Sequence, residues 1–254
     1  MDRIVISKAY PQHHDALLHL LESFDTSDAP LIGQGDRNVI KAMPLGQETV
    51  AVKSFKEPNM VNKWVYRFWR QSKAERSFRY AQKLIDLNVG TAQPIAFAET
   101  YKHFGIQRSF YLSQGLDPDF TFRELIHDLS IPKRDYIIEK FTEFTFDLHQ
   151  KGILFHDHSP GNTLIKWIDG QVYFYLVDLN RMTFKPLSTK QRIQNFSRLT
   201  PLKEMVQAMS QTYARCAGLD TAEVFNQMWR ATEQFQYKFH RKRRLKKRLF
   251  FWRR

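Results

Sequence analysis

The stretch GILFHDHSPGNTLI, residues 152–165, organises the whole chain. It places Asp157 five residues before Asn162, and strand-forming residues follow directly. This spacing suits a loop that holds a hydroxyl group near a carboxylate while an amide oxygen reaches a metal ion. Aspartate and asparagine are also the common residues of surface turns. The stretch therefore predicts a site only if the rest of the chain supplies its partners.

The composition is that of a folded protein, with 254 residues of which 43% are hydrophobic and 26% are charged. This length predicts one large domain or two modest lobes. No apolar run reaches the roughly 18 residues of a transmembrane helix, and the charged N-terminus predicts no secretory signal. A single cysteine, Cys216, excludes an internal disulfide framework and a cysteine zinc site. We therefore expect a cytoplasmic protein.

The net charge of +13 comes mainly from the C-terminus, since residues 238–254 hold ten Lys or Arg residues and no acid. Apolar and aromatic residues interrupt this basic tail. The combination suits an anionic membrane surface. Charge alone would also suit nucleic acid, and a solvated, partly disordered tail is a third interpretation. The interrupting residues are Leu245, Leu249, Phe250, Phe251 and Trp252.

Gly33 and Gly35 precede two expected strands, which are separated by a turn near residues 44–46. Such a glycine loop can lay backbone N–H groups over a polyphosphate. By itself the pattern favours an ordinary hairpin with flexible glycines. The other elements expected outside the central stretch are strands at 3–7, 95–101 and 109–113, helices at 13–24 and 71–86, and a long helix with Ile137, Phe141, Phe144 and Leu148 on its buried face.

Lys53 changes this balance, because it ends the apolar strand Val50-Ala51-Val52-Lys53. A lysine there can reach phosphate oxygens if a carboxylate holds its ammonium group. Glu75 is the only acid between Glu57 and Asp86, and it borders the apolar stripe of the expected helix. We predict a Lys53–Glu75 ion pair. The alternative is a surface glutamate that pairs along its own helix.

A second strand pair ends at Gln114-Gly115-Leu116, and a proline-containing loop follows. This pattern suits a hinge between lobes, whose backbone would bind an adenine edge. Gln114 and Leu116 are therefore candidate nucleotide contacts. Beyond residue 121 helical patterns dominate.

The residues after Asn162 predict a hairpin, with Asp169-Gly170 as its two-residue turn. Pairing about this turn returns Asp178 to the side of Asn162. A carboxylate and an amide oxygen at that place could share Mg²⁺. Asp157 would lie on the same rim.

Taken in order, the glycine loop, Lys53, Glu75, the hinge, Asp157, Asn162 and Asp178 resemble the protein-kinase-like fold. Residues 50–53 are similar to its lysine motif, residues 157–162 to its catalytic loop, and residues 177–180 stand where the family has Asp-Phe-Gly. The resemblance implies an α+β, two-lobed fold with an antiparallel-sheet N-lobe and a mostly helical C-lobe. We expect an N-terminal lobe at 1–116, a C-lobe at 117–237 and the basic aromatic tail at 238–254.

Departures from the protein-kinase pattern concern the substrate. Phe155 and His156 replace the usual His-Arg, and Ser159 replaces the lysine that assists Ser or Thr substrates. Asn38 and Asn180 replace glycines, and no Ala-Pro-Glu segment follows. These differences are usual in kinases of small molecules and sugars.

Within the superfamily the chain resembles the lipopolysaccharide kinase (Kdo/WaaP) family. The resemblance implies an ATP-dependent kinase, membrane-associated on the cytoplasmic face of the inner membrane, that phosphorylates a lipid A–core sugar, Kdo or heptose. Lys53 and Glu75 would orient ATP, Asn162 and Asp178 would hold Mg²⁺, and Asp157 would accept or orient the proton of the acceptor hydroxyl. The resemblance rests on Gly35–Asn38, Val50–Phe55, Ser72–Glu75, Asp157–Asn162 and Val177–Met182.

Three other functions remain open from the sequence. They are an atypical bacterial protein Ser/Thr kinase, a nucleotide-binding pseudokinase scaffold, and a nucleic-acid-associated ATPase that uses the tail. The joint presence of Lys53, Asp157, Asn162 and Asp178 disfavours a scaffold, and no nucleic acid partner is expected. His156 and His158 could be interpreted as metal ligands, but neighbours of a loop aspartate point in different directions.

Overall fold

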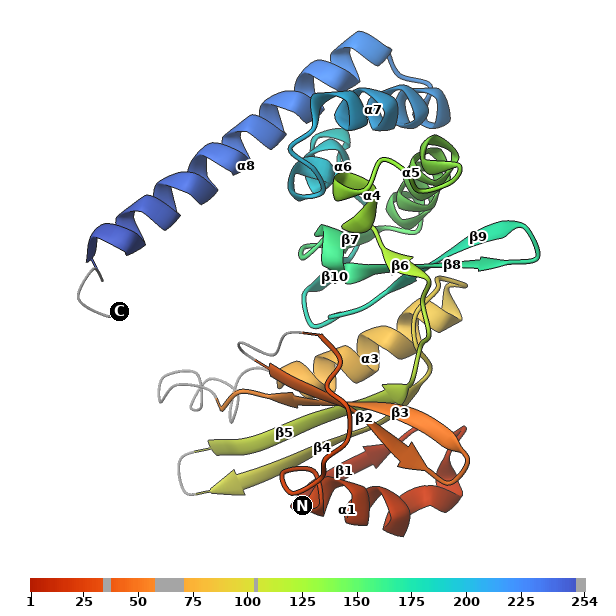
Figure 1. Cartoon of the computed structure of the whole chain (residues 1–254), viewed down its shortest axis with the longest axis vertical. Helices are drawn as coiled ribbons and strands as arrows, with labels where there is room; N and C mark the ends of the chain where they lie inside the picture. The colour runs from red at the N-terminus through yellow and green to blue at the C-terminus, as the bar shows by residue number, and fades with distance from the viewer. Residues whose placement is uncertain (34–37, 58–70, 103–104, 250–254) are drawn as a thin grey trace. The chain divides into compact units, whose positions relative to one another are not determined.

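The computed structural model describes residues 1–33, 38–57, 71–102 and 105–249, without the side chains of residues 246, 247 and 249. The chain divides into two compact units (Figure 1). The first contains Met1–Asp117 and Tyr175–Asn180, and the second contains Pro118–Phe174 and Arg181–Arg254. The expected partition at residues 116, 117, 237 and 238 stays a prediction.

The first unit is built on a five-stranded antiparallel sheet with strand order β1-β4-β5-β3-β2. Gly46 has φ +63° in the tight turn between β2 and β3, where a positive φ suits the twist of the hairpin. The strands are β1 (Arg3–Ile6), β2 (Asn38–Leu45), β3 (Glu48–Phe55), β4 (Pro94–Lys102) and β5 (Gly105–Gln114).

Two helices of the first unit cover opposite faces of this sheet. Helix α1 (His14–Glu22) packs its leucines against the face that contains Val52 and Leu112, with the short 3-10 helix η1 (Pro11–His13) before it. Helix α3 (Lys73–Asp86) contacts the other face through Phe78 and Phe97, whose ring centroids are 5.4 Å apart. Because side chains alternate along a strand, Lys53 lies on the α3 face.

The second unit is mostly helical. Its core gathers aromatic and aliphatic side chains of α5 and α7, such as Phe141, Met209 and Tyr213, around the buried Phe122 and Phe196. The helices are α4 (Glu124–His127), α5 (Arg134–Gln150), α6 (Thr189–Gln194), α7 (Lys203–Ala217) and α8 (Thr221–Leu249), with 3-10 turns η2 (Pro160–Asn162) and η3 (Asn195–Arg198).

Two small sheets frame the central stretch of sequence. Strand β7 (Ile153–Phe155) pairs with β10 (Met182–Phe184), and β8 (Thr163–Ile168) lies between β6 (Phe120–Thr121) and β9 (Gln171–Leu176). Asp169 has φ +50° and Gly170 has φ +79°, as a two-residue turn with both φ angles positive requires. The predicted hairpin is therefore confirmed, and so are the expected helices at 71–86 and around Phe141.

Helix α8 has two contrasting halves. Val224, Met228 and Thr232 in its first half are buried against the rest of the second unit. From Tyr237 onward the side chains that the structure describes are exposed. The first part of the basic tail is therefore a continuous extension of a packed helix (Figure 1). None of the described helices is long and apolar enough to span a membrane.

Candidate active site

The loop between β7 and β8 has a fixed backbone. Gly152 enters β7 with φ +70°, and an added Cβ there would lie 2.9 Å from the Lys185 carbonyl oxygen, so glycine is required. The Asn162 side chain donates its Nδ2 to the carbonyl oxygen of Asp157 at 2.8 Å. With the amide nitrogen used in this way, the Asn162 amide oxygen is the group left to bind a cation.

Two arginines flank the carboxylate of Asp157, whose side chain is 19% exposed. Arg198 donates Nη1 to Asp157 Oδ1 at 2.7 Å and to the His156 carbonyl oxygen at 3.0 Å. Arg181 Nη1 lies 3.7 Å from Asp157 Oδ2. Arg198 was not predicted from the sequence, since it comes 41 residues after Asp157. No local motif pointed to it.

The two histidines beside Asp157 have different environments. His156 is exposed and its Nε2 lies 2.7 Å from Thr183 Oγ1. His158 is fully buried against the rings of Phe141, Phe155 and Phe196. Burial lowers the pKa of His158 to about 3, so the ring is neutral at pH 7. In the described part of the chain, no cluster of three or more His, Cys, Asp or Glu residues could hold a metal ion.

This buried histidine predicts a pH dependence of stability. Burial also lowers the pKa of His149 to about 4, whereas an unfolded histidine titrates near 6.5. Below pH 6.5 the unfolded state binds protons that the folded state does not. The stabilisation from the two neutral histidines is therefore fully present above pH 6.5, and it is lost as the pH decreases toward their folded pKa values of about 4 and about 3. Each histidine contributes a slope of about 1.4 kcal/mol per pH unit.

Chemical denaturation of wild type and His158→Phe between pH 7 and pH 5 measures this slope. We expect the variant, which keeps a ring among the three phenylalanines, to show about half the wild-type dependence on these two groups. A Phe196→Leu control should lower stability equally at each pH. An unchanged slope in His158→Phe would contradict the prediction.

Lys53 and Asp178 form the ion pair of the first unit. Lys53 Nζ lies 2.5 Å from Asp178 Oδ1, and the Lys53 side chain is only 12% exposed. The Asn180 side chain donates Nδ2 to the same carboxylate oxygen at 2.7 Å. Asp178 has φ +58°, an uncommon conformation for a non-glycine residue and one that recurs at functional sites.

The segment that contains Asp178 is tied to the loop after α3. Leu176 donates its N–H to the carbonyl oxygen of Gly90 at 2.9 Å, and the Thr91 hydroxyl donates to the carbonyl oxygen of Leu176 at 2.8 Å. These bonds hold residues 175–180 in the first unit, where Asp178 meets Lys53.

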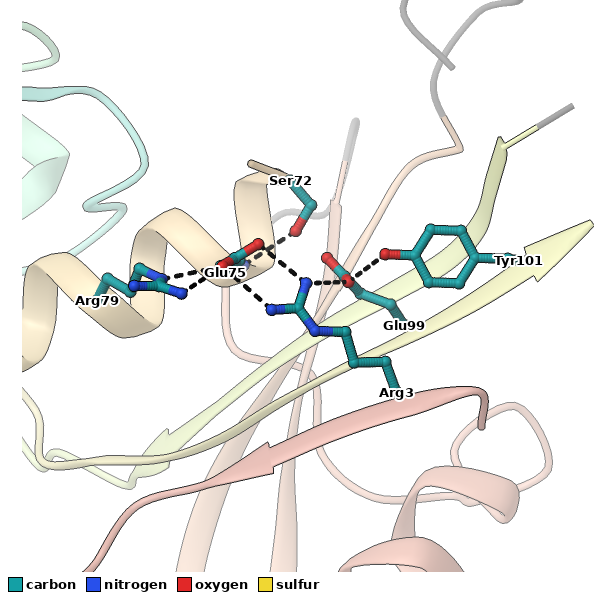
Figure 2. A network of polar contacts seen from close by, with 6 residues as sticks. All are labelled: Arg3, Ser72, Glu75, Arg79, Glu99 and Tyr101. Atoms are coloured by element: carbon teal, nitrogen blue, oxygen red, sulfur yellow. Dashed lines mark hydrogen bonds and ion pairs between the residues drawn. The ribbon is translucent and has the colours of Figure 1, made fainter. Parts of the chain in front are cut away.

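The predicted Lys53–Glu75 ion pair is wrong for this structure. Glu75 is buried at the edge of the apolar stripe, as expected, but it faces other cations (Figure 2). Arg3 contacts both Glu75 carboxylate oxygens, at 3.1 and 3.2 Å, and Arg79 pairs with Oε1 at 2.8 Å. Arg3 and Arg79 occupy the Glu75 carboxylate, and Lys53 pairs with Asp178 instead.

Arg3 also joins Glu75 to a second buried carboxylate, Glu99, through a hydrogen bond of 3.2 Å. The Tyr101 hydroxyl donates to Glu99 at 2.6 Å, and burial with this hydrogen bond raises the pKa of Tyr101 to about 12 (Figure 2). Tyr101 therefore stays a neutral donor. The network ties β1 and β4 to the first turn of α3.

Arg3→Ala is expected to lower the free energy of unfolding by about 2–3 kcal/mol, because it leaves two buried carboxylates with one fewer cation. Arg108→Ala is a matched control. Both arginines lie about 5 Å from a phenylalanine ring, but the Arg108 partner, Asp25, is 69% exposed. We expect that control to cost less than about 1 kcal/mol. Urea denaturation measures both, and equal losses would contradict burial as the cause.

The remaining predicted nucleotide contacts lie in the first unit or outside the described residues. Gly35 is outside them, and Gly33 has φ +75° with open space around an added Cβ. At the predicted hinge, Gln114 is exposed and Leu116 is half-buried. The Gly115 N–H donates to the Thr49 carbonyl oxygen at 2.8 Å, and an added Cβ there would lie 2.8 Å from that oxygen. Glycine is required at position 115 because the Thr49 carbonyl oxygen of β3 approaches it so closely.

The sequence profile of the lipopolysaccharide kinase (Kdo/WaaP) family matches residues 59–217. The chain belongs to this family. The matched region includes Asp157, Asn162 and Asp178, whereas Lys53 precedes it. A search of curated proteins finds no match.

The chain is similar to several solved structures. WaaP in complex with acyl carrier protein has a TM-score of 0.62 and 16% sequence identity, with 91% of this chain and 98% of that chain covered. The Rio2 kinase–ADP/Mg²⁺–phosphoaspartate complex from Chaetomium thermophilum has a TM-score of 0.48, 13% identity and coverages of 87% and 68%. The MAP kinase LmaMPK10 from Leishmania major has a TM-score of 0.47, 15% identity and coverages of 84% and 66%.

Family membership identifies the protein as a lipopolysaccharide kinase-family phosphotransferase that uses ATP. The antiparallel sheet of the first unit and the helices of the second agree with the expected α+β, kinase-like fold.

Proposed function

We propose that this Kdo/WaaP-family protein transfers the γ-phosphate of ATP to a hydroxyl group of a lipopolysaccharide inner-core sugar, either Kdo or heptose. The observation that carries the proposal is the family match over residues 59–217. The family match supports a sugar hydroxyl as the acceptor. The absence of sequence features that protein kinases use for peptide substrates also favours such an acceptor. Ser159 in place of lysine is the main such feature.

Lys53 is the proposed ligand of the ATP phosphates, with Gly33 and Gly35 over the phosphates and Gln114 and Leu116 beside the adenine. The Lys53–Asp178 ion pair supports this role, because it holds the ammonium group on the α3 face of the sheet beside the carboxylate. The phosphate oxygens of a bound nucleotide can accept from the same Lys53 ammonium group.

Asn162 and Asp178 are the proposed ligands of Mg²⁺. The donor chemistry fits, since a carboxylate and an amide oxygen are hard ligands, and the Asn162 amide nitrogen is already used by Asp157. When bound, the ion would neutralise charge on the β- and γ-phosphates.

Asp157 is the proposed acceptor of the proton from the sugar hydroxyl. Phosphoryl transfer needs positioning and charge neutralisation more than a strong base, so its main task is to orient the hydroxyl. The contact of Oδ1 with Arg198 supports this task, because it fixes the carboxylate. Oδ2, which lies 3.7 Å from Arg181 Nη1, is the oxygen proposed to bond the acceptor hydroxyl.

Mass spectrometry of the lipid A–core fraction from cells with and without this protein tests the proposed function. We expect one phosphate fewer on the core sugars of cells that lack it, and its return when the wild-type gene is restored. Identical lipid A–core spectra in both strains would contradict the proposal.

The exposed second half of α8 is proposed to bind an anionic membrane surface at the cytoplasmic face of the inner membrane. Exposed Tyr237, Phe239 and Leu245 accompany the basic side chains of this half. Each basic residue near such a surface contributes about 1 kcal/mol. Such a contact would bring the enzyme to an acceptor that is embedded in the membrane.

Liposome flotation of the full chain and a 1–237 truncation tests this partner. Stronger binding of the full chain to anionic vesicles is expected, and equal binding would contradict it. WaaP has been solved with acyl carrier protein. A pull-down of the full chain and the 1–237 truncation with acyl carrier protein would show whether the tail binds that protein instead.

A further inference from the structure

The Asp157 loop (residues 155–162) carries Phe155, His156 and Ser159 where protein kinases have histidine, arginine and lysine. In this structure, contacts from η3 hold the same backbone. Asn195 donates Nδ2 to the Phe155 carbonyl oxygen at 2.8 Å. Arg198 bonds the His156 carbonyl oxygen and the Asp157 carboxylate. Three consecutive loop residues are therefore held from one 3-10 turn.

A buried hydrogen-bond chain fixes the Asn195 end of this turn. His149 Nδ1 lies 2.9 Å from the Tyr213 hydroxyl, and its Nε2 lies 3.1 Å from Asn195 Oδ1. Burial keeps His149 neutral, with a pKa lowered to about 4. A neutral His149 ring that donates from Nε2 to Asn195 Oδ1 accepts at Nδ1 from the Tyr213 hydroxyl. The Asn195 amide nitrogen then donates to the Phe155 carbonyl oxygen.

Helix α8 fixes the Arg198 end. The Arg198 guanidinium carbon lies 5.5 Å from the centre of the Phe235 ring, a cation–π contact. Phe196, between the two ends, is 1% exposed and packs against His149, His158 and Tyr213. The turn is thus anchored in the core at its centre and braced on both sides.

We propose that residues 195–198 form a clamp on the Asp157 loop and that Arg198 is the positioning residue of Asp157. Nη1 of Arg198 bonds both the His156 carbonyl oxygen and Asp157 Oδ1, so it fixes the carboxylate relative to the adjacent backbone. Oδ2, which lies 3.7 Å from Arg181 Nη1, then orients the acceptor. Arg198 thus supplies a cation to the Asp157 carboxylate from 41 residues downstream. The inference rests on the role proposed for Asp157 above.

Kinetic comparison of Arg198→Ala, Arg198→Lys and Arg215→Ala in the full chain tests the clamp. Arg215 is a matched control, since it pairs with Glu139 and Glu143 in the same unit. With lipid A–core as acceptor, we expect Arg198→Ala to lower kcat about 100-fold, the effect of a misplaced reacting group. The KM for ATP should stay near the wild-type value, and Arg215→Ala should match wild type.

Rescue separates positioning from a loss of fold. Added guanidinium ion should raise the kcat of Arg198→Ala and leave Arg215→Ala unchanged, because the Arg198 side chain is 35% exposed and its site is open to solvent. Arg198→Lys should recover only part of kcat, since an ammonium lacks the planar fork. If Arg198→Ala fails to fold, the lysine variant carries the comparison.

Amide hydrogen exchange tests the clamp independently of the acceptor. We expect Arg198→Ala to speed exchange at His158 and Asn162, whose amides bond Phe155 and Ser159, with α5 and α7 unchanged. Unchanged exchange together with unchanged kcat would overturn the clamp. If the wild-type protein phosphorylates no lipid A–core, the proposed function fails, whereas exchange still decides the clamp.

Discussion

Asp157→Ala is expected to reduce phosphate transfer about 1,000-fold, the range for loss of a positioned acid or base, while nucleotide binding persists. Binding should persist because the contacts of the Asp157 carboxylate are to Arg181 and Arg198, whereas Lys53 pairs with Asp178. The loop should also survive, since Asn162 bonds the Asp157 carbonyl oxygen rather than its side chain.

Steady-state transfer assays and nucleotide titration calorimetry measure these two properties separately. Asp147→Ala is the control, because Asp147 is 52% exposed on α5 and pairs only with Lys151 among the described ion pairs. Wild-type turnover in Asp157→Ala would refute the role of Asp157. Loss of both turnover and nucleotide binding would instead indicate a structural role.

Asp178→Asn is expected to cause a loss of similar size. Removal of a metal contact that neutralises phosphate charge costs several kcal/mol, or about 1,000-fold in rate. Asparagine has the same shape and tolerates the φ of +58° at this position, so the backbone should be preserved. The variant also leaves the buried Lys53 ammonium without its carboxylate.

Magnesium titrations of nucleotide binding provide the readout. Wild type should bind nucleotide more tightly as Mg²⁺ is added, and Asp178→Asn should respond much less. Asp169→Asn is a matched control with the same chemical change at another positive φ, +50°, in the hairpin turn. An Asp178→Asn enzyme with wild-type magnesium dependence would exclude Asp178 as a ligand.

Local chemistry made much of the fold predictable from the sequence. Asp169-Gly170 between two strand-forming runs specified the β8–β9 hairpin, and both residues have the positive φ that such a turn demands. The apolar stripe beside Glu75 specified α3 and the burial of that carboxylate. These features depend on neighbours in the sequence, which is why they could be read directly.

Contacts between distant segments could not be read in this way. The partner of Glu75 is Arg3, 72 residues away on an edge strand, and its proximity depends on the register of β1 against β4. The partner of Asp157 is Arg198, on a 3-10 turn without a recognisable motif. An arginine is a better partner than lysine for a carboxylate, but nothing in the local sequence selects which one.

The composition of the tail also left its structure undetermined. The ten basic residues at positions 238–254 are compatible with a solvated coil, a membrane contact or a nucleic acid contact. The structure adds that α8 continues through Leu249 from a first half that packs through Val224, Met228 and Thr232.

Phosphate transfer to purified lipid A–core tests the central proposal most directly. The full chain is incubated with Mg²⁺, ATP radiolabelled at the γ-phosphate and lipid A–core that lacks the phosphate. The proposed function predicts label in the core sugar as a phosphate ester with wild type, and none with Asp157→Ala. ATP consumption without label in the sugar, or label in protein instead, would contradict it.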